Sequence, residues 1–126
     1  MRFWIFMLLV GLLCPVIMIA AGISFLKAAP KKINSVYGYR TELSMKNQDT
    51  WEFAHKYCGK VWLRGGLILL PVAVIPMLLV IGNSTEIVGI GGSIIGTLGV
   101  VVLIASIFPT ESALRKNFDE RGNRKL

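Results

Sequence analysis

The residues best suited to chemistry lie in one polar stretch, residues 30–59, which holds the single histidine of the chain. Glu52 and His55 are spaced to share one face of a helix, as ligands of di-iron bundles do, and Cys58 follows at the same spacing. A di-iron site needs a second such motif with further carboxylates, and a structural zinc site needs four ligands. A Cys–His nucleophile pair needs a third group that orients it, and none is evident. We therefore predict no metal site, no cofactor and no catalytic residue in this stretch.

A second group of side chains in the same stretch is suited to recognition. Residues 37–41 read Tyr-Gly-Tyr-Arg-Thr and combine two aromatic hydroxyls, a flexible glycine and a guanidinium. The Arg40 guanidinium is a planar fork of donors that matches a carboxylate or a phosphate. The candidate binding residues are Asn34, Tyr37, Gly38, Tyr39, Arg40, Thr41, Ser44, Asn47, Trp51 and His55. The same residues could instead form a folding motif that fastens a loop across the helix ends, and the sequence leaves both interpretations open.

A helix is predicted to start at Asp49, because Asp49 and Glu52 have the spacing of a capping box. Its apolar stripe would consist of Trp51, Ala54, Cys58 and Val61. This helix would run directly into the apolar segment that follows. We expect Trp51 to lie under the loop at the membrane surface, with Arg40 and Asn47 converging above it.

Three apolar blocks surround the polar stretch. Residues 3–26, 61–81 and 87–108 contain neither Asp nor Glu, in a chain that is 54% hydrophobic and 17% charged. About 20 helical residues cross a hydrocarbon core, and each block is long enough to do so. We predict an all-α membrane protein with three transmembrane helices in a single domain, residues 1–126. The first block is longer than the apolar region of a signal peptide and no cleavage pattern ends it, so we expect a retained helix.

The positions of the cations predict the orientation of the helices. Of the 14 Lys and Arg residues, all except Arg2 lie between Lys27 and Arg64 or in the tail, residues 109–126. With three spans, the loop 27–60 and the tail share one side, and cytoplasmic segments carry the excess of Lys and Arg. We therefore predict that the N-terminus is outside and that the loop and C-terminus are cytoplasmic. The net charge of +7 then reflects topology and contact with the lipid bilayer, without direct binding of nucleic acid.

Glycines in the third block predict close helix packing. Gly89, Gly92, Gly96 and Gly99 recur at steps of three and four and share one face, which includes a Gly-x-x-x-Gly motif. This seam could face the first helix, the second helix or a second copy of the chain, so a homo-oligomer is one of the alternatives. The sequence does not choose among them.

Prolines and turn residues predict the shape of the first two helices. Pro15, Pro71 and Pro76 lie inside apolar blocks, where proline removes a backbone donor and kinks a helix. A broken helix at Pro71 and Pro76 could also line a binding cavity. Residues 82–86 predict a tight hairpin between the second and third helices.

The tail predicts one more short element. Thr110, Ala113, Leu114 and Phe118 have the spacing of an amphipathic turn or helix, which Gly122 is expected to end. Its cations would lie against inner-leaflet headgroups or against the loop.

The loop and the tail also resemble a known family. In the loop the likeness is carried by Pro30, Asn34, Tyr37, Gly38, Tyr39, Arg40, Thr41, Ser44, Lys46, Asn47, Trp51, Ala54 and Gly59. In the tail it is carried by Thr110, Glu111, Ala113, Leu114, Phe118, Asp119, Gly122, Asn123 and Arg124. Over about residues 30–126, the chain resembles the SdpI family of bacterial membrane proteins.

The resemblance implies immunity to a toxin. SdpI-family proteins protect a producing bacterium from a secreted, membrane-active peptide, and the best-known type also holds a transcriptional repressor at the membrane. The resemblance thus implies the bacterial cytoplasmic membrane, a peptide toxin within the bilayer and a cytoplasmic regulator as partners, and immunity or signalling as the function. The alternative is a small intramembrane enzyme or a protein that binds an anionic ligand or lipid headgroup, held by Arg40 and Asn47.

Overall fold

The computed structural model describes residues 1–34 and 36–125. It contains four helices: α1 (Arg2–Ala28), α2 (Gln48–Leu79), α3 (Thr85–Ala105) and α4 (Ile107–Asn117). Three segments are long and apolar enough to cross a membrane, namely Arg2–Ala28, Gln48–Leu79 and Thr85–Asn117. Between Met1 and Lys125, leaving aside residue 35, no β-strand is formed. The prediction of an all-α protein with three membrane-spanning helices is therefore confirmed.

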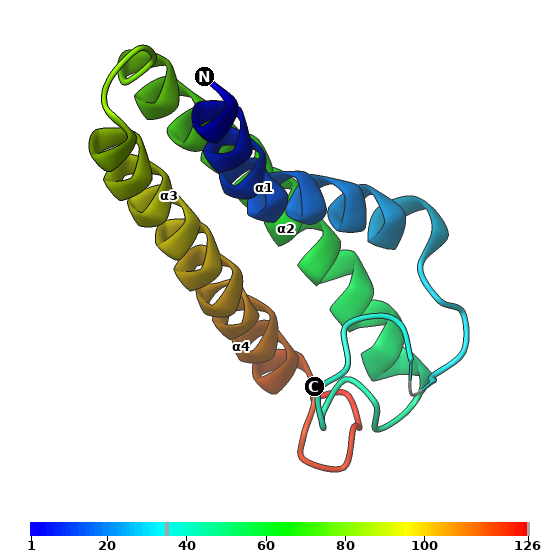
Figure 1. Cartoon of the computed structure of the whole chain (residues 1–126). Helices are drawn as coiled ribbons and strands as arrows, with labels where there is room; N and C mark the ends of the chain where they lie inside the picture. Colours follow the sequence, from blue (N-terminus) through cyan, green and yellow to red (C-terminus); the bar gives the residue numbers. More distant parts are fainter. Residues whose placement is uncertain (35, 126) are drawn as a thin grey trace.

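The helices form a bundle with two different ends (Figure 1). The N-terminus and the turn between α2 and α3 lie at one end, and the α1–α2 loop and the C-terminal segment lie at the other. α4 continues nearly along the line of α3. We call the end that holds the loop and the C-terminal segment the polar end. This arrangement agrees with the prediction that the loop and the tail lie on the same side.

α1 and α2 meet backbone to backbone, because glycines lie where they cross. A Cβ atom on Gly22 would lie 2.7 Å from the backbone nitrogen of Leu63 and 2.9 Å from the carbonyl oxygen of Gly59. One on Gly66 would lie 3.0 Å from the carbonyl oxygen of Pro15. Small residues at such crossings let helices pack by van der Waals contact. Gly22 and Gly59 lie outside the glycine seam predicted for the third helix.

The predicted seam itself lies mainly along α1. A Cβ on Gly92 would overlap the Met7 side chain, and one on Gly99 would lie 2.9 Å from the Cβ of Cys14. Gly89 is in ordinary contact distance of α1, whereas a Cβ on Gly96 would meet nothing within 4 Å. The first helix is therefore the neighbour that the seam faces in this chain.

Four of the five prolines lie within helices, and Pro30 lies in the loop. Pro15 is inside α1, whose second half turns away from its first half (Figure 1), and Pro71 and Pro76 are inside α2. Pro109 falls in the first turn of α4, just after Ser106, where α3 and α4 meet. The third span was expected to end at Phe108, but α4 continues the helical structure to Asn117.

Two predicted helix boundaries are wrong. The N-cap of α2 is Asn47, whose Oδ1 accepts the Thr50 N–H at 2.9 Å while the Thr50 hydroxyl oxygen accepts the Asn47 N–H at 3.1 Å. This is the capping box, two residues before the predicted Asp49–Glu52 pair, and a threonine hydroxyl fills the place that Glu usually takes. α4 ends at Asn117, and Gly122 lies in the turn beyond it with φ +85°.

Buried apolar side chains form two clusters along the bundle. The cluster at the polar end consists of Phe25, Tyr39, Ala54, Cys58, Leu114 and Phe118. The cluster toward the other end consists of Met7, Ala73, Met77, Val88 and Ile95. The first cluster combines residues of α1, the loop, α2, α4 and the segment after α4. It therefore joins the polar loop to all the elements around it.

Candidate functional site

His55 attaches the loop to α2. Its Nε2 accepts the backbone N–H of Tyr39 at 3.0 Å, and its Nδ1 donates to the carbonyl oxygen of Trp51 at 2.8 Å. One accepting and one donating nitrogen correspond to the neutral imidazole. The side chain is fully buried, with the rings of Phe25 and Trp51 at 4.9 and 4.4 Å. Both ring nitrogens of His55 are thus engaged in holding the loop.

Trp51 and Gly38 form the contact beneath the loop. Trp51 is fully buried, and its indole N–H donates to the carbonyl oxygen of Pro30 at 2.7 Å. Gly38 passes over this pair with φ +116°, a conformation that L side chains rarely adopt. A Cβ there would lie 2.6 Å from Nε2 of His55 and 3.2 Å from the Trp51 ring. Glycine is therefore required both by the backbone and by the space.

We expect Gly38→Ala to destabilise the fold by about 1–3 kcal/mol, since it combines an unfavourable φ with a collision against His55. Gly82→Ala is the matched control, because Gly82 also has a positive φ of +81° but nothing lies within 4 Å of its added Cβ. The measurement is the free energy of unfolding in detergent micelles, followed by circular dichroism. Equal losses in the two variants would contradict the tight contact at Gly38.

Tyr39 connects the loop to α4. Its hydroxyl donates to Oε1 of Glu111 at 2.8 Å and lies 3.4 Å from the carbonyl oxygen of Ile107. Burial raises the pKa of the Tyr39 hydroxyl above its ordinary value, and the bond to Glu111 adds to this shift. The phenol therefore stays protonated as a donor. The bond between Tyr39 and Glu111 links two residues that are 72 positions apart in the sequence.

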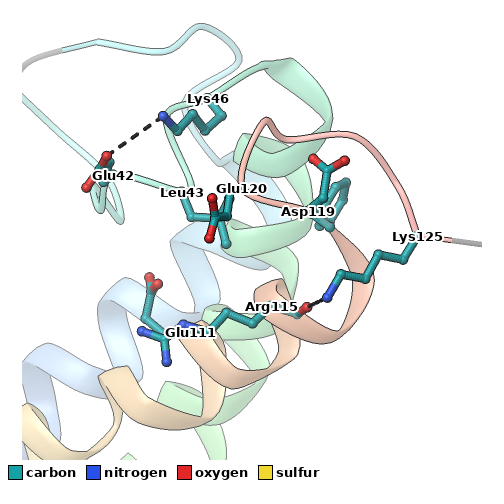
Figure 2. A pocket seen from close by; sticks show the side chains of 9 residues that line it. Glu42, Leu43, Lys46, Glu111, Arg115, Asp119, Glu120 and Lys125 are labelled. Atoms are coloured by element: carbon teal, nitrogen blue, oxygen red, sulfur yellow. Dashed lines mark hydrogen bonds and ion pairs between the residues drawn. The ribbon is translucent and has the colours of Figure 1, made fainter.

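A groove opens between the loop and α4 (Figure 2). Its volume is about 720 Å³, and it is lined by Glu42, Leu43, Lys46, Glu111, Arg115, Phe118, Asp119, Glu120 and Lys125. We call it the cap groove. Side chains of both charges point toward it, and Glu42 pairs with Lys46 at 3.8 Å. This lining suits a partner surface that carries charges of both signs.

Several predicted binding residues form turns within the loop. Oδ1 of Asn34 accepts the backbone N–H groups of Val36 and Tyr37 at 3.0 and 2.7 Å. The Ser44 hydroxyl accepts the Thr41 N–H at 2.8 Å, and its oxygen lies 3.0 Å from the Tyr39 carbonyl. The Tyr37 hydroxyl is 2.8 Å from the hydroxyl of Ser24 in α1. These contacts shape the loop and tie it to the first helix.

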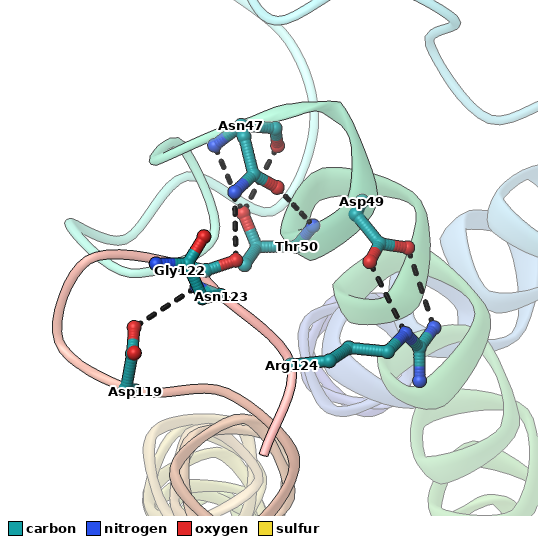
Figure 3. Close-up of polar contacts among 7 residues, drawn as sticks. All are labelled: Asn47, Asp49, Thr50, Asp119, Gly122, Asn123 and Arg124. Atoms are coloured by element: carbon teal, nitrogen blue, oxygen red, sulfur yellow. Dashed lines mark hydrogen bonds and ion pairs between the residues drawn. The ribbon is translucent and has the colours of Figure 1, made fainter. Parts of the chain in front are cut away.

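The C-terminal segment closes over the start of α2 (Figure 3). Nδ2 of Asn47 donates to the carbonyl oxygen of Gly122 at 2.7 Å. Arg124 donates to both carboxylate oxygens of Asp49, at 3.1 and 3.3 Å, and its guanidinium lies 5.0 Å from the centre of the Phe118 ring. We call the loop, the first turns of α2 and residues 118–125 the cap.

Asp119 stabilises the turn of this closing segment. Its Oδ1 accepts the backbone N–H groups of Asn123 and Arg121, both at 2.9 Å. The bond from Asn123 is the main reason that the pKa of the Asp119 carboxyl lies below its ordinary value. The carboxylate is thus charged at neutral pH and holds the turn that presents Gly122 to α2.

Arg40 and Asn47 were expected to converge above Trp51 as an anion site. Arg40 is exposed on the loop. The amide of Asn47 uses its oxygen for the helix cap and its nitrogen for Gly122, so both of its polar atoms are engaged within the chain. This arrangement favours the folding interpretation for Asn47. Among residues 1–34 and 36–125, no group of three or more His, Cys, Asp or Glu side chains is placed to hold a metal ion.

The long-range pairs of the cap could not be found by sequence reasoning. Glu111 with Tyr39 and Asp49 with Arg124 are separated by 72 and 75 positions. Their residue types are complementary, but the chain offers many donors and acceptors of the same types. Only the fold brings these particular ones together.

Comparison with known proteins identifies the family. A model of the SdpI/YfhL protein family matches residues 31–110, which include the loop, α2, α3 and the start of α4. The chain is also similar to a protein of Bacillus subtilis (strain 168) described as "Uncharacterized protein YfhL", with 44% identity over 59 residues. The aligned part is 47% of this chain and 54% of that relative, about half of each. No solved structure matches the chain. The family match covers well over half of the chain, which therefore belongs to the SdpI/YfhL protein family.

Proposed function

We propose that this chain is an immunity protein of a bacterial cytoplasmic membrane, which protects the cell from a secreted, membrane-active peptide. The observation that carries the proposal is the family match over residues 31–110, since SdpI-like proteins are known for this role. The three spanning helices support it, because they offer a protein surface inside the bilayer where such a peptide acts.

The proposed orientation has the N-terminus outside and the cap in the cytoplasm. The Lys and Arg residues other than Arg2 are concentrated toward the polar end, and positive charge is retained on the cytoplasmic side. In this orientation, the opposite end of the bundle is the first part that an arriving peptide meets.

A groove at that outer end is the proposed place of contact. It lies between α1 and α3, has a volume of about 470 Å³ and is lined by Phe3, Met7, Thr85, Glu86, Gly89, Ile90, Ser93 and Ile94. Thr85 and Glu86 lie at its outer rim, at the first turn of α3, and the apolar Ile90 and Ile94 follow further along the same helix. This polarity matches an amphipathic peptide at the membrane surface.

The test is survival of a sensitive bacterium that expresses this chain and is challenged with purified membrane-active peptides. We expect wild type to preserve growth and membrane potential at a concentration that kills cells carrying an empty vector. Ser93→Leu should abolish this protection by filling the groove. Thr97→Leu is the matched control, because Thr97 is also exposed on α3 but lies one turn beyond the groove lining.

Two outcomes would contradict the proposal, provided that both variants reach the membrane at the wild-type level. If wild type protected the cells against none of the peptides tested, the immunity role would be rejected. Equal protection by Ser93→Leu and wild type would reject the groove as the place of contact.

Membrane signalling is a second candidate function. The cap groove, with four carboxylates and three cations in its lining, favours the docking of a cytoplasmic regulator protein with a charged surface. In the same strain, transcript levels measured with and without peptide separate the two roles. A response that depends on this chain supports signalling, and protection without any such response supports immunity alone.

A further inference from the structure

A second groove at the polar end runs along α4, and we call it the α4 groove. Its volume is about 470 Å³, and it is lined by Ile107, Phe108, Glu111, Ser112, Arg115, Lys116 and Lys125. One end is apolar and the other is cationic. Phe108 is 71% exposed, so its ring lies on the outside of the bundle. The opposite face of α4 is buried, with Thr110 and Leu114 fully covered.

The apolar end of this groove lies at the expected level of the membrane surface. Tryptophan side chains collect where hydrocarbon meets water, and the indole N–H of Trp62 donates to the Ser106 hydroxyl at 2.7 Å. Ser106 is the residue that joins α3 to α4. We therefore expect the first turn of α4 to leave the apolar layer and its later turns to enter the headgroup layer.

Charge gives the groove a preference. The cationic end of the groove is lined by Arg115, Lys116 and Lys125. The lining contains one carboxylate, that of Glu111, which already accepts the Tyr39 hydroxyl. Arg and Lys are the side chains that bind phosphate oxygens most strongly, and the Ser112 hydroxyl adds a donor. The Lys125 ammonium donates to the Arg115 carbonyl at 2.8 Å, which keeps the C-terminal segment beside α4.

We propose that the α4 groove binds an anionic glycerophospholipid, with its phosphate on the cations of α4 and one acyl chain along Ile107 and Phe108. A glycerophospholipid has an anionic phosphate at one end and hydrocarbon chains at the other. The groove likewise has cations at one end and apolar surface at the other. The site is separate from the peptide groove of the proposed function but shares Glu111, Arg115 and Lys125 with the cap groove. It would place an ordered lipid next to the Tyr39–Glu111 link of the cap.

The test uses the full chain reconstituted in phosphatidylcholine vesicles that contain a trace of spin-labelled phosphatidylglycerol or spin-labelled phosphatidylcholine. Electron paramagnetic resonance measures the fraction of each label that the protein immobilises. We expect wild type to prefer phosphatidylglycerol. The double variant Arg115→Gln with Lys116→Gln should remove most of this preference, because each of the two cations contributes roughly a fivefold factor near an anionic membrane surface.

The matched control is Lys31→Gln with Lys32→Gln, which removes the same charge from exposed positions of the loop. It should keep most of the preference. Equal losses in the two double variants would overturn the proposal, because diffuse attraction would then account for the preference. No preference in wild type would also overturn it. Unchanged circular dichroism and unchanged elution in detergent verify that each variant is folded.

A Phe108→Ser variant tests the apolar half of the site with all cations in place. It should reduce immobilisation of both labelled lipids, because the acyl chain loses its contact while the phosphate contacts stay. Wild-type immobilisation in this variant would overturn the assignment of the acyl chain to this end of the groove.

Discussion

Replacing Trp51 by alanine should lower the free energy of unfolding by about 3–5 kcal/mol, the usual cost of truncating a large buried aromatic side chain. Trp51 is fully buried, donates to the Pro30 carbonyl and packs against His55 at 4.4 Å between ring centres. Its removal leaves a cavity under Gly38 and an unpaired carbonyl at the end of the first span. The loop should then become accessible to protease while the spanning helices stay intact.

Tyr57→Ala is the control for the Trp51 variant. Tyr57 is on the same helix but is 37% exposed, and its ring stacks on Phe53 at 6.0 Å. Its truncation should cost about 1 kcal/mol or less, as is usual for surface positions. The measurements are unfolding in detergent micelles and the rate of limited proteolysis in the loop. Similar costs in the two variants would contradict the assignment of Trp51 as the support of the loop.

Replacing Gly22 by leucine should cost about 3 kcal/mol or more, at the upper end of the range for overpacking. The added Cβ alone would come within 3.0 Å of backbone atoms of Leu63 and Gly59, and backbone within a helix cannot turn aside as a side chain can. α1 and α2 would have to separate along their crossing. We expect loss of the compact form in size-exclusion chromatography and a lower unfolding midpoint.

Gly96→Leu is the matched control for this crossing. Gly96 is also a glycine within a spanning helix, but a Cβ there meets nothing within 4 Å. The substitution should be neutral or slightly stabilising, because leucine has the higher helix propensity. If Gly96→Leu destabilised the protein as much as Gly22→Leu, the Gly96 face would be a packed surface, and the separate role of the α1–α2 crossing would be wrong.

Sequence patterns were sufficient to predict the all-helical architecture with three spanning helices. Three long apolar blocks without acids predict spanning helices directly, because the bilayer leaves few alternatives for a buried backbone. Helix boundaries were less accurate. Asn47 and Thr50 can form a capping box as well as Asp49 and Glu52 can, and in the structure the earlier pair forms it, with Asn47 also donating to Gly122.

The loop motif shows a clear limit of sequence reasoning. Tyr39, Arg40 and Asn47 have side chains that could bind an anion, and the same side chains could fasten a loop. The choice depends on which partners lie within hydrogen-bond distance. In the structure, Tyr39 meets Glu111 and Asn47 meets Gly122, so these two contribute to the cap. Arg40 is exposed on the loop.

The residue types of the polar stretch 30–59 and of the apolar blocks around it determined by themselves that a polar loop lies beside membrane helices. Its cations also predict on which side of the membrane the loop lies. Only the tertiary structure decided that His55 accepts the Tyr39 N–H, that Arg124 reaches Asp49, and that Gly22 sets the spacing of α1 and α2. The physical reason is that hydrophobic periodicity acts locally along the chain, whereas hydrogen bonds and close packing depend on distances that distant segments acquire only when the bundle has formed.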